Sequence, residues 1–389
     1  MPDIAPPAAR SVTQMLLPFS LIVFLGYSVI GIPLSTLPLQ VHDALGYGTT
    51  MVGVVIGLSA AVTLLTRQVA GGLSDRRGPK FAVLAGLCTA ALTGVAYLLS
   101  TVLPSGPGLV ALLAGRLVLG LGDSLFTTGV MAWAVHRVGA HNAGRAMAWI
   151  GIAMYGALAV GAPVGATLGW LGGFGAVSLA VVVMPLLAVP VALSLPGPPG
   201  VTHRRASFLG VVRRIWPPGL ALVLASSGFG TIAAFLSLRY AALGWSGAGL
   251  ALTGFGAAYI ASRVLLAGLP DRLGGIRVAI ASLAIEAVGL ALIATAASPV
   301  MAFVGTAVTG LGYSMVFPSL GVEAVRRVPP ESRGVALGAF LACFDLGLGA
   351  AGPVTGLVAG GYGLPAAFVT AAVAAVLSIV LVWTTRVRG

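Results

Sequence analysis

Long apolar runs alternate with short polar connectors along this chain, and the pattern predicts helices that cross a membrane. A helix needs about 20 largely apolar residues to cross a bilayer. Twelve such runs occur, over 14–41, 49–70, 81–102, 108–135, 144–170, 174–195, 217–242, 247–269, 276–297, 299–325, 333–360 and 364–385. The predicted fold class is therefore an all-α integral membrane protein with twelve transmembrane helices.

The connectors alternate in charge. Those that follow the second, fourth, sixth, eighth and tenth runs contain Lys or Arg, whereas those that follow the third, fifth, ninth and eleventh contain neither. Cytoplasmic loops of membrane proteins are enriched in Lys and Arg. We therefore predict a multi-pass protein of a bacterial-type inner membrane, with the basic connectors and both termini in the cytoplasm.

Composition supports the membrane prediction. The chain has 58% hydrophobic and 8% charged residues, whereas a soluble domain carries about 25% charged residues. The net charge of +12 does not indicate a nucleic-acid partner, because the basic residues are spread over short connectors and form no patch. The sequence shows no metal-ligand cluster, nucleophile triad or phosphate loop, so we expect neither a cofactor nor enzymatic activity.

Two segments of the chain resemble each other. In 66–78, Arg67 precedes Asp75 by eight residues, and in 262–274, Arg263 precedes Asp271 by the same spacing. In both we expect the acidic residue to lie in a tight glycine turn after the span. A charged group placed twice at the same point of an apolar segment indicates an internally duplicated membrane protein.

The duplication extends over six spans. Residues 144–163 match 334–353, each ending in a proline that Val follows. We predict two six-helix bundles, 1–196 and 217–389, joined by a cytoplasmic linker, 197–216, which is rich in proline and arginine.

This organisation resembles the major facilitator superfamily. The loop from Gly71 to Lys80 is similar to the superfamily's signature between spans 2 and 3, and span 4 carries an Arg-x-x-x-Gly-x-Gly pattern that begins at Arg116. Span 5 resembles the "antiporter" motif of exporters, with one residue inserted before the proline; its members here are Gly156, Gly161, Pro163 and Gly165. The resemblance is nearest to the drug/proton antiporter and arabinose-efflux-permease-like branches. It implies that the span-5 motif packs against span 8.

The resemblance also implies a cytoplasmic gate built from both motif copies. We expect Asp75 to act there with Arg67, and Asp271 with Arg263, while the two halves are closed on that side. The gating residues that we predict are Arg67, Gly71, Asp75, Arg76, Gly78, Lys80, Arg263, Asp271 and Arg272.

Ionisable residues inside the predicted spans are candidates for function. Arg116 and Asp123 are seven residues apart and share one helix face, so we expect Arg116 to tune Asp123. Asp345 lies near the midplane, has no evident basic partner, and matches Tyr155 in the repeat. We predict proton coupling by Asp345, Asp123 and Arg116, with Asp345 favoured as the proton carrier and Asp123 as a substrate contact.

Other polar and aromatic residues inside spans receive less specific predictions. We expect Glu286 in span 9 to have a partner within the second half, and Arg239 to anchor span 7 at the interface. Phe126 and Phe235 are candidates for cavity or packing. The predicted substrate cavity comprises Asp123, Tyr155, Tyr259, Tyr313, Phe344 and Asp345.

The resemblance implies a secondary transporter that exports a small organic molecule, drug-like or a metabolite, in exchange for protons by alternating access. Its expected partners are the substrate, protons and the lipid bilayer, and a monomer suffices. One alternative is a proton-coupled importer of a sugar or organic acid. Another is a non-transporting membrane sensor or an intramembrane enzyme, although the loops are short and no catalytic constellation is visible.

Overall fold

The computed structural model describes residues 11–200, 208–329 and 333–387, and every regular element in these ranges is helical. Eleven of the described helices are long and apolar enough to cross a membrane. One of them, α6, contains two of the predicted spans, which brings the number of crossings to twelve. The predicted all-α membrane fold class is therefore confirmed.

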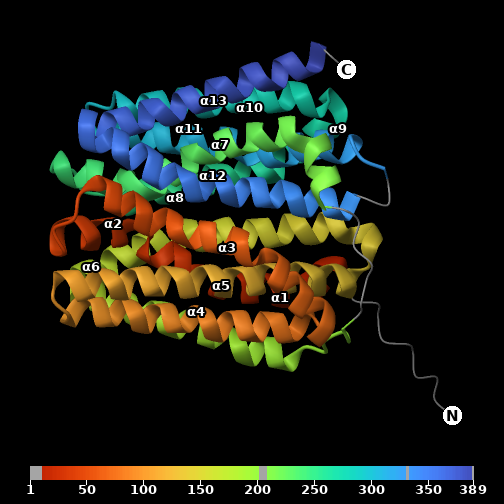
Figure 1. Cartoon of the computed structure of the whole chain (residues 1–389), viewed down its shortest axis with the longest axis horizontal. Helices are drawn as coiled ribbons and strands as arrows, with labels where there is room; N and C mark the ends of the chain where they lie inside the picture. Colours follow the sequence, from red (N-terminus) through yellow and green to blue (C-terminus); the bar gives the residue numbers. More distant parts are fainter. Residues whose placement is uncertain (1–10, 201–207, 330–332, 388–389) are drawn as a thin grey trace.

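The first group of helices comprises six crossings that pack mainly on one another (Figure 1). Lipid supplies no hydrophobic driving force, so small residues that allow close approach hold such helices together. The elements of this N-terminal group are α1 (Val12–Gly31), η1 (Ile32–Ser35), α2 (Leu37–Leu39), η2 (Gln40–Ala44), α3 (Thr49–Arg77), α4 (Pro79–Val102), α5 (Ser105–Val138), η3 (Ala140–Asn142) and α6 (Ala143–Ser194).

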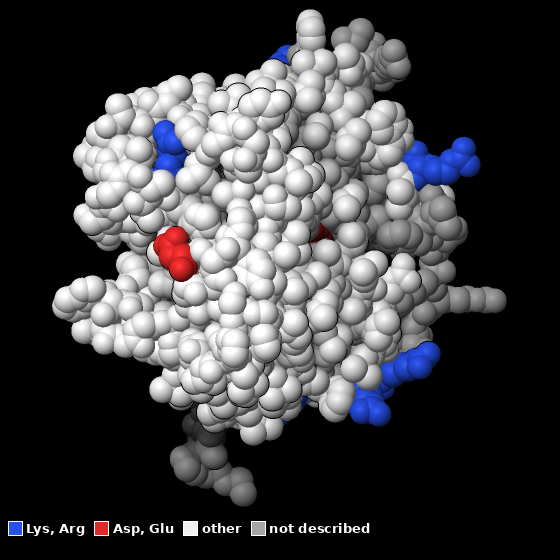
Figure 2. Space-filling view, turned by 60° about the vertical axis from the view of Figure 1, so that its left-hand side comes forward, with Lys and Arg blue, Asp and Glu red and all other residues white. Residues whose placement is uncertain are grey.

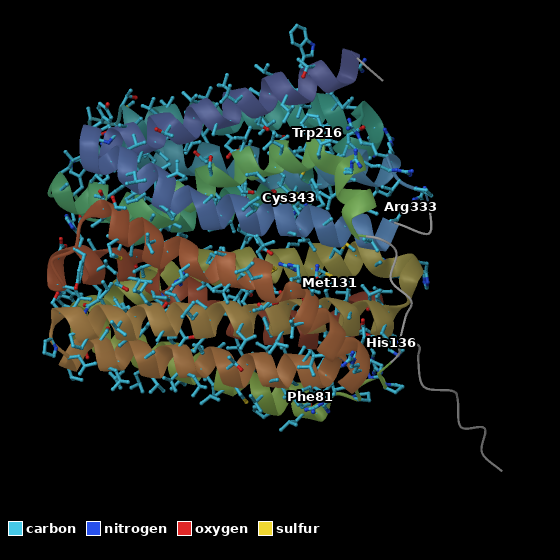
Figure 3. The ribbon with its side chains drawn as sticks, in the orientation of Figure 1. Phe81, Met131, His136, Trp216, Arg333 and Cys343 are labelled. Carbon is cyan, nitrogen blue, oxygen red and sulfur yellow. The ribbon has the colours of Figure 1, made fainter. Side chains whose placement is uncertain are left out.

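The second group forms the upper half of Figure 1 and also packs mainly within itself. Figure 3 places Cys343 inside this group, where its sulfur lies against Gly219. The elements of the C-terminal group are α7 (Phe208–Ala242), α8 (Ala248–Leu265), α9 (Leu269–Leu273), α10 (Gly275–Ala294), α11 (Pro299–Arg326), α12 (Arg333–Tyr362) and α13 (Leu364–Val387).

Helix α6 runs through the connector that we expected between 144–170 and 174–195. Its 52 residues are helical except at Gly172 and Gly173, and Gly173 has a φ of 64°. Glycine adopts positive φ without the steric penalty of a Cβ. The chain therefore reverses its direction between the two spans of α6 within these two glycines.

Two predicted boundaries are wrong. The first span was expected to continue to residue 41, but α1 ends at Gly31 and short 3₁₀, α and π turns follow, with Pro33 and Pro38 in this segment. A proline cannot donate the backbone hydrogen bond that continues a helix. Asp75 was expected in a turn, but α3 continues through Arg77 and the turn is at Gly78, with a φ of 89°.

The bundle has two chemically different ends. We call the end at which residues 11 and 387 lie the terminal face, and the opposite end the far face (Figure 1). Figure 3 places His136 and Arg333 at the terminal face, one on each group. The view turned toward the far face is almost without charged side chains (Figure 2), and Asp43 is the one carboxylate in the connectors of that face.

Two helix pairs make most of the contact between the groups: α3 with α12, and α6 with α8. Along α3 and α12 the backbones touch, because a Cβ added at Gly53 would overlap the carbonyl of Gly352, and one at Gly57 would overlap that of Gly349. The Thr49 hydroxyl donates to the Gly356 carbonyl at 3.0 Å, near the far face. Along α3 and α12, the groups are therefore in direct contact between the far face and the middle of the bundle.

Candidate functional site

An ion pair joins the two groups near the middle of the bundle. Arg67 of α3 donates to Asp345 Oδ2 of α12 from Nη2 at 2.5 Å and from Nε at 2.9 Å. The side chains are 19% and 8% exposed. Arg67 and Asp345 lie about 15 and 18 Å along their helices from the terminal face. The prediction that Asp345 lacks a basic partner is wrong, and Arg67 contacts the opposite group.

Asp123 of α5 lies close to this pair. Its Oδ2 accepts a hydrogen bond from the Thr63 hydroxyl at 3.3 Å, and it is within electrostatic range of Arg67 and Asp345. The same Thr63 hydroxyl is 3.0 Å from the Gly120 carbonyl. Two carboxyl groups and one guanidinium therefore share the centre of the bundle.

Arg116 has a different environment from the one we predicted. Its guanidinium donates to the carbonyls of Val55 at 2.7 Å and Ile56 at 2.5 Å, and to the Ser59 hydroxyl at 2.6 Å. These acceptors all belong to α3, and no ion pair with Asp123 occurs among the described residues. Arg116 therefore ties α5 to α3 and acts on Asp123 only over a distance.

Tyr27 of α1 is a residue of this site that the sequence analysis missed. It lies within electrostatic range of Asp123, Asp345 and Arg67. With Asp123 and Phe126 it borders a small cavity of about 10 Å³, which is about the space that one water molecule occupies. A tyrosine in an apolar span gives no charge signal, so only its place in the fold identifies it.

Three of the predicted cavity residues form an aromatic cluster that crosses between the groups. Tyr155 of α6 stacks on Tyr259 of α8, with ring centroids 3.5 Å apart and an interplanar angle of 19°. Tyr313 lies 6.2 Å from Tyr259. Phe229 and Phe255 complete the cluster and were not predicted. Such ring pairs stabilise their arrangement by about 0.5–1.5 kcal/mol beyond burial.

Phe344 lies apart from this cluster. It packs edge-on against Phe317, with centroids 6.1 Å apart. Phe126 and Phe235 are buried packing residues in the two groups. Neighbouring residues on a helix point about 100° apart, so Phe344 faces a different direction from Asp345.

Arg263 reaches the aromatic cluster. Its Nη2 donates to the Tyr259 hydroxyl at 2.9 Å, and its guanidinium lies 5.5 Å from the centroid of the same ring. The arginines of both motif copies thus lie where the two groups meet. Asp271 lies in α9, but its side chain is outside the described part of the chain.

The remaining predicted gate residues lie at the terminal face. Lys80 donates to the carbonyls of Leu193 at 2.8 Å and Leu195 at 2.7 Å, so it caps the end of α6. Gly78 lies next to the Pro198 carbonyl. Asp75 is half-buried, Arg76 and Arg272 are exposed, and Gly71 lies within α3.

The span-5 motif packs against α1 as well as against α8, the contact that we expected. A Cβ at Gly161 or Gly165 would overlap the backbone of Gly31 and Ile32, so these glycines bring α6 onto the end of α1. Pro163 is the motif residue that approaches α8, at Gly249. A Cβ at Gly156 would be in ordinary van der Waals contact with Ile260 of α8 and Phe24 of α1. The motif therefore holds the N-terminal group together as much as it forms the contact with α8.

Two further ionisable residues are buried in the C-terminal group. Glu286 is fully buried, and neither carboxylate oxygen has a hydrogen-bond partner among the described residues, so the partner that we predicted is not found there. Arg239 lies near the far-face end of α7 and donates to the carbonyls of Ala294 at 2.9 Å and Ala296 at 3.3 Å. It therefore caps the end of α10.

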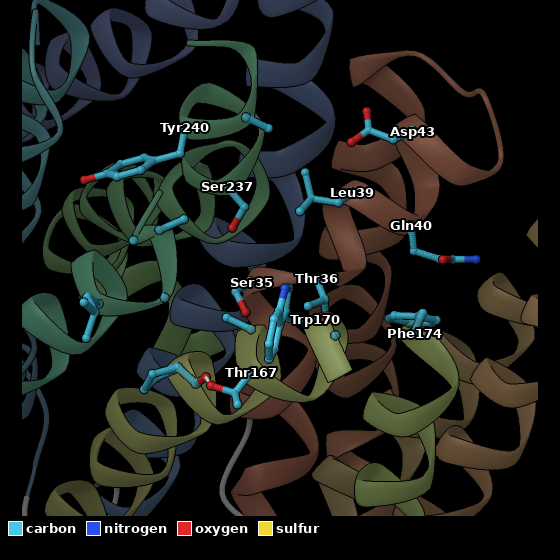
Figure 4. Close-up of a pocket in the computed structure, with 18 of the residues that line it drawn as sticks. Ser35, Thr36, Leu39, Gln40, Asp43, Thr167, Trp170, Phe174, Ser237 and Tyr240 are labelled. Atoms are coloured by element: carbon cyan, nitrogen blue, oxygen red, sulfur yellow. Dashed lines mark hydrogen bonds between the residues drawn. The ribbon is translucent and has the colours of Figure 1, made fainter. Parts of the chain in front are cut away.

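A pocket of about 680 Å³ lies at the far face between the groups (Figure 4). Ser35, Trp170 and Phe174 line its N-terminal side, and Ser237 and Trp245 line the other. The Ser237 hydroxyl has no partner among the described residues and is directed into the pocket (Figure 4). The cavity residues that we predicted lie elsewhere, nearer the middle of the bundle.

The described residues bring together no group of three His, Cys, Asp or Glu side chains that could hold a metal ion. What the centre of the bundle offers is two carboxyl groups, one cross-group ion pair and an aromatic surface. This chemistry suits proton exchange and non-covalent binding rather than bond making.

Three comparisons with known proteins agree with this architecture. The profile of the Major Facilitator Superfamily matches residues 19–247 and 218–389. An uncharacterized MFS-type transporter of Burkholderia pseudomallei (strain 1106a) is 43% identical over 97% of this chain and 93% of its own length. The uncharacterized MFS-type transporter YhhS of Escherichia coli (strain K12) is 39% identical over 100% of this chain and 97% of its own.

Solved structures show the same fold. The nucleoside transporter NupG, in a crystal structure of a mutant, superposes with a TM-score of 0.77 at 17% identity, covering 96% of this chain and 99% of NupG. The human organic anion transporter MFSD10 (TETRAN) superposes with a TM-score of 0.71 at 17% identity, covering 96% of this chain and all of the other.

Proposed function

The chain belongs to the Major Facilitator Superfamily, so it is a transporter and not an enzyme, and we propose that it exports a small organic molecule in exchange for protons. The proposal includes an orientation. The terminal face, which carries the basic connectors, lies in the cytoplasm. The two helix groups then move as rigid units around the central site.

The observation that carries the proposal is the Arg67–Asp345 ion pair between the groups, with Asp123 beside it. A charge inside a membrane is costly, so such residues are retained mainly for function. An ion pair between two moving units also makes their relative position depend on whether the carboxylate is charged.

The coupling step follows from this dependence. Proton binding to Asp345 cancels the charge that Arg67 holds, and the contact between α3 and α12 weakens. We expect the loss of this pair to change the free-energy difference between the two arrangements by about 1–3 kcal/mol, which is enough to shift their populations. In the proposed cycle, a proton binds Asp345 from outside while the far face is open. Its release to the cytoplasm then lets the Arg67–Asp345 pair, and with it the closed far face, form again.

The observed arrangement represents one half of this cycle. Along α3 and α12 the groups are in contact from the far face to the middle, and in the proposed orientation the substrate then enters from the cytoplasm. Asp123 and the aromatic cluster contact it there. Export, rather than import, is supported by the resemblance of the span-5 motif to that of exporters.

The residues at the terminal face act in the opposite half of the cycle. Asp75 lies half-buried at the end of α3, where it can help to close the cytoplasmic side once the far face opens. In this proposal, Arg67 leaves Asp345 and becomes available to the cytoplasmic gate only after Asp345 has been protonated. Asp75→Asn should therefore slow transport without abolishing substrate binding.

Transport into proteoliposomes with an imposed pH gradient tests the proposal. The panel should contain cationic, neutral and anionic amphiphiles, together with nucleosides and organic anions, which the names of the two fold neighbours suggest. We expect uphill movement of at least one compound against proton flow. Asp345→Asn should abolish uphill transport but keep downhill exchange, and Glu323→Gln at the terminal face should change neither.

Full proton-driven accumulation in both Asp345→Asn and Asp123→Asn would overturn the coupling mechanism. Accumulation in the same direction as proton flow would show an importer.

A further inference from the structure

The duplicated arginines have unequal partners. Arg67 of α3 has a carboxylate, Asp345 of α12. Arg263 of α8 has only the Tyr259 hydroxyl and ring. The Nε of Arg263 is buried and has no hydrogen-bond partner among the described residues. One of two repeat-related cations at the junction of the groups is therefore uncompensated within the described side chains.

The repeat explains this difference. Residues 144–163 match 334–353, so Tyr155 stands where Asp345 stands in the other copy. Helix α8 packs on α6 as α3 packs on α12. Tyr155 is thus related to Arg263 as Asp345 is to Arg67. The Tyr259 ring stacks on the Tyr155 ring, with centroids 3.5 Å apart. Tyrosine supplies a hydroxyl and a ring face but not the negative charge that aspartate supplies.

We propose that the substrate supplies this charge: Arg263 binds the anionic group of an organic anion, and the neighbouring aromatic side chains pack against its flat body. This inference rests on the proposed function, since it names the substrate class for the transport site. A guanidinium binds a carboxylate or phosphate through two parallel N–H groups, and the unpartnered Nε of Arg263 is such a donor.

The surroundings of Arg263 suit this ligand. Arg263 is half-buried as a whole although its Nε is enclosed, and Tyr155 and Tyr259 are buried beside it. The other two central arginines are already satisfied, Arg67 by Asp345 and Arg116 by acceptors on α3. Binding would neutralise a charge that is costly inside a membrane, and this favours an anion over a neutral analogue.

Binding of three probes that share one aromatic body tests the inference. Naphthoate, naphthamide and naphthylmethylamine are added to purified protein in nanodiscs, without a pH gradient, and binding is measured by equilibrium dialysis. We expect naphthoate to bind at least about tenfold more tightly than naphthamide, as a hydrogen bond to a charged group implies. Arg263→Gln should remove this preference, and Arg263→Lys should restore part of it.

Two controls separate recognition from folding. Arg277→Gln, at an exposed arginine of the terminal face, should keep the preference. Asp271→Asn should also keep it. If Asp271→Asn instead raised naphthoate affinity about tenfold or more, Asp271 would be the anion that Arg263 holds, and the inference would be overturned.

The readouts distinguish this inference from the proposed function. An anion preference that Arg263→Gln removes, without any proton-driven transport, would refute the transport mechanism and leave the binding site intact. Proton-driven transport with equal binding of all three probes would refute the binding site and leave the transport mechanism intact. An unchanged preference in folded Arg263→Gln would assign Arg263 to packing on Tyr259 alone.

Discussion

Asp345→Asn removes a charge at the junction of the two helix groups while keeping the size of the side chain. It therefore copies proton binding at this carboxyl group. In the described arrangement Asp345 pairs with Arg67 while the groups are closed at the far face. We expect the substitution to shift the population toward an arrangement that is open at the far face. Acidification should move the wild-type protein in the same direction.

The size of the shift follows from the geometry of the pair. Two unit charges about 4 Å apart interact by about 4 kcal/mol at an effective dielectric constant of about 20. The two side chains are 19% and 8% exposed, so desolvation cancels part of this attraction. A net coupling of about 1–3 kcal/mol remains, which changes a conformational equilibrium by about 5- to 150-fold.

Pulsed EPR distances measure that equilibrium. Nitroxides at Gly106 on α5 and Gly361 on α12 report the far face, and a Cβ at either position meets open space. Arg67→Gln, Asp345→Asn and the double variant form a thermodynamic cycle. Each single change should enlarge the population with long distances. Because the two residues interact, the shift in the double variant should be smaller than the sum of the two single shifts.

Glu323→Gln is the matched control for this cycle. It removes a pair with Arg326 that lies within α11 and is 3.4 Å long, with Arg326 64% exposed. An exposed pair contributes about 0–1 kcal/mol, and this one does not join the groups. Distances that stay constant in Asp345→Asn and across pH would refute the reasoning, because the pair would then persist in both arrangements.

Three further predictions concern orientation, closure and stability. Single cysteines are placed at Gly106 and His141 in a cysteine-free background and treated with an impermeant maleimide. The cysteine at Gly106 should label in intact cells, and that at His141 only after lysis; the reverse pattern would invert the orientation. Gly53→Val should hold the far face open in the EPR assay, because its side chain would overlap the backbone of α12, whereas Gly72→Ala, which meets open space, should not. Arg239→Met leaves two carbonyls of the C-terminal group without their donor, so we expect the free energy of unfolding to fall by about 1–3 kcal/mol. This loss should appear as a lower melting temperature in detergent. Unchanged stability would indicate that water replaces the guanidinium.

Hydrophobic runs predicted the helices well, because a bilayer demands both length and apolarity. They predicted the ends of helices less well. Asp75 and Arg76 read as turn residues in the sequence, yet α3 passes through them and ends at Gly78. The physical reason is that polar residues at a membrane surface are tolerated in a last helical turn as readily as in a loop.

The candidate site was only partly predictable. Asp123, Asp345 and the three tyrosines were identified because polar groups are rare in spans. Their partners were not, since Arg67 and Asp345 are 278 positions apart in the sequence and meet only through the packing of two halves. Glu286 shows the converse case, where a buried charge led us to expect a partner that the described residues do not contain.

The glycine-lined junction of α3 and α12 has a consequence for the kinetics of the cycle. Where Gly53 meets Gly352 and Gly57 meets Gly349, the touching surfaces are backbone, so sliding there resets no side-chain rotamers and loses no side-chain conformational entropy. Most of that junction thus opposes the sliding of the two helices only weakly. Among the described residues, the charged contact of this junction is that of Arg67 with Asp345. Under the proposed mechanism, we therefore expect the activation barrier to be concentrated at this pair and turnover to depend on its protonation.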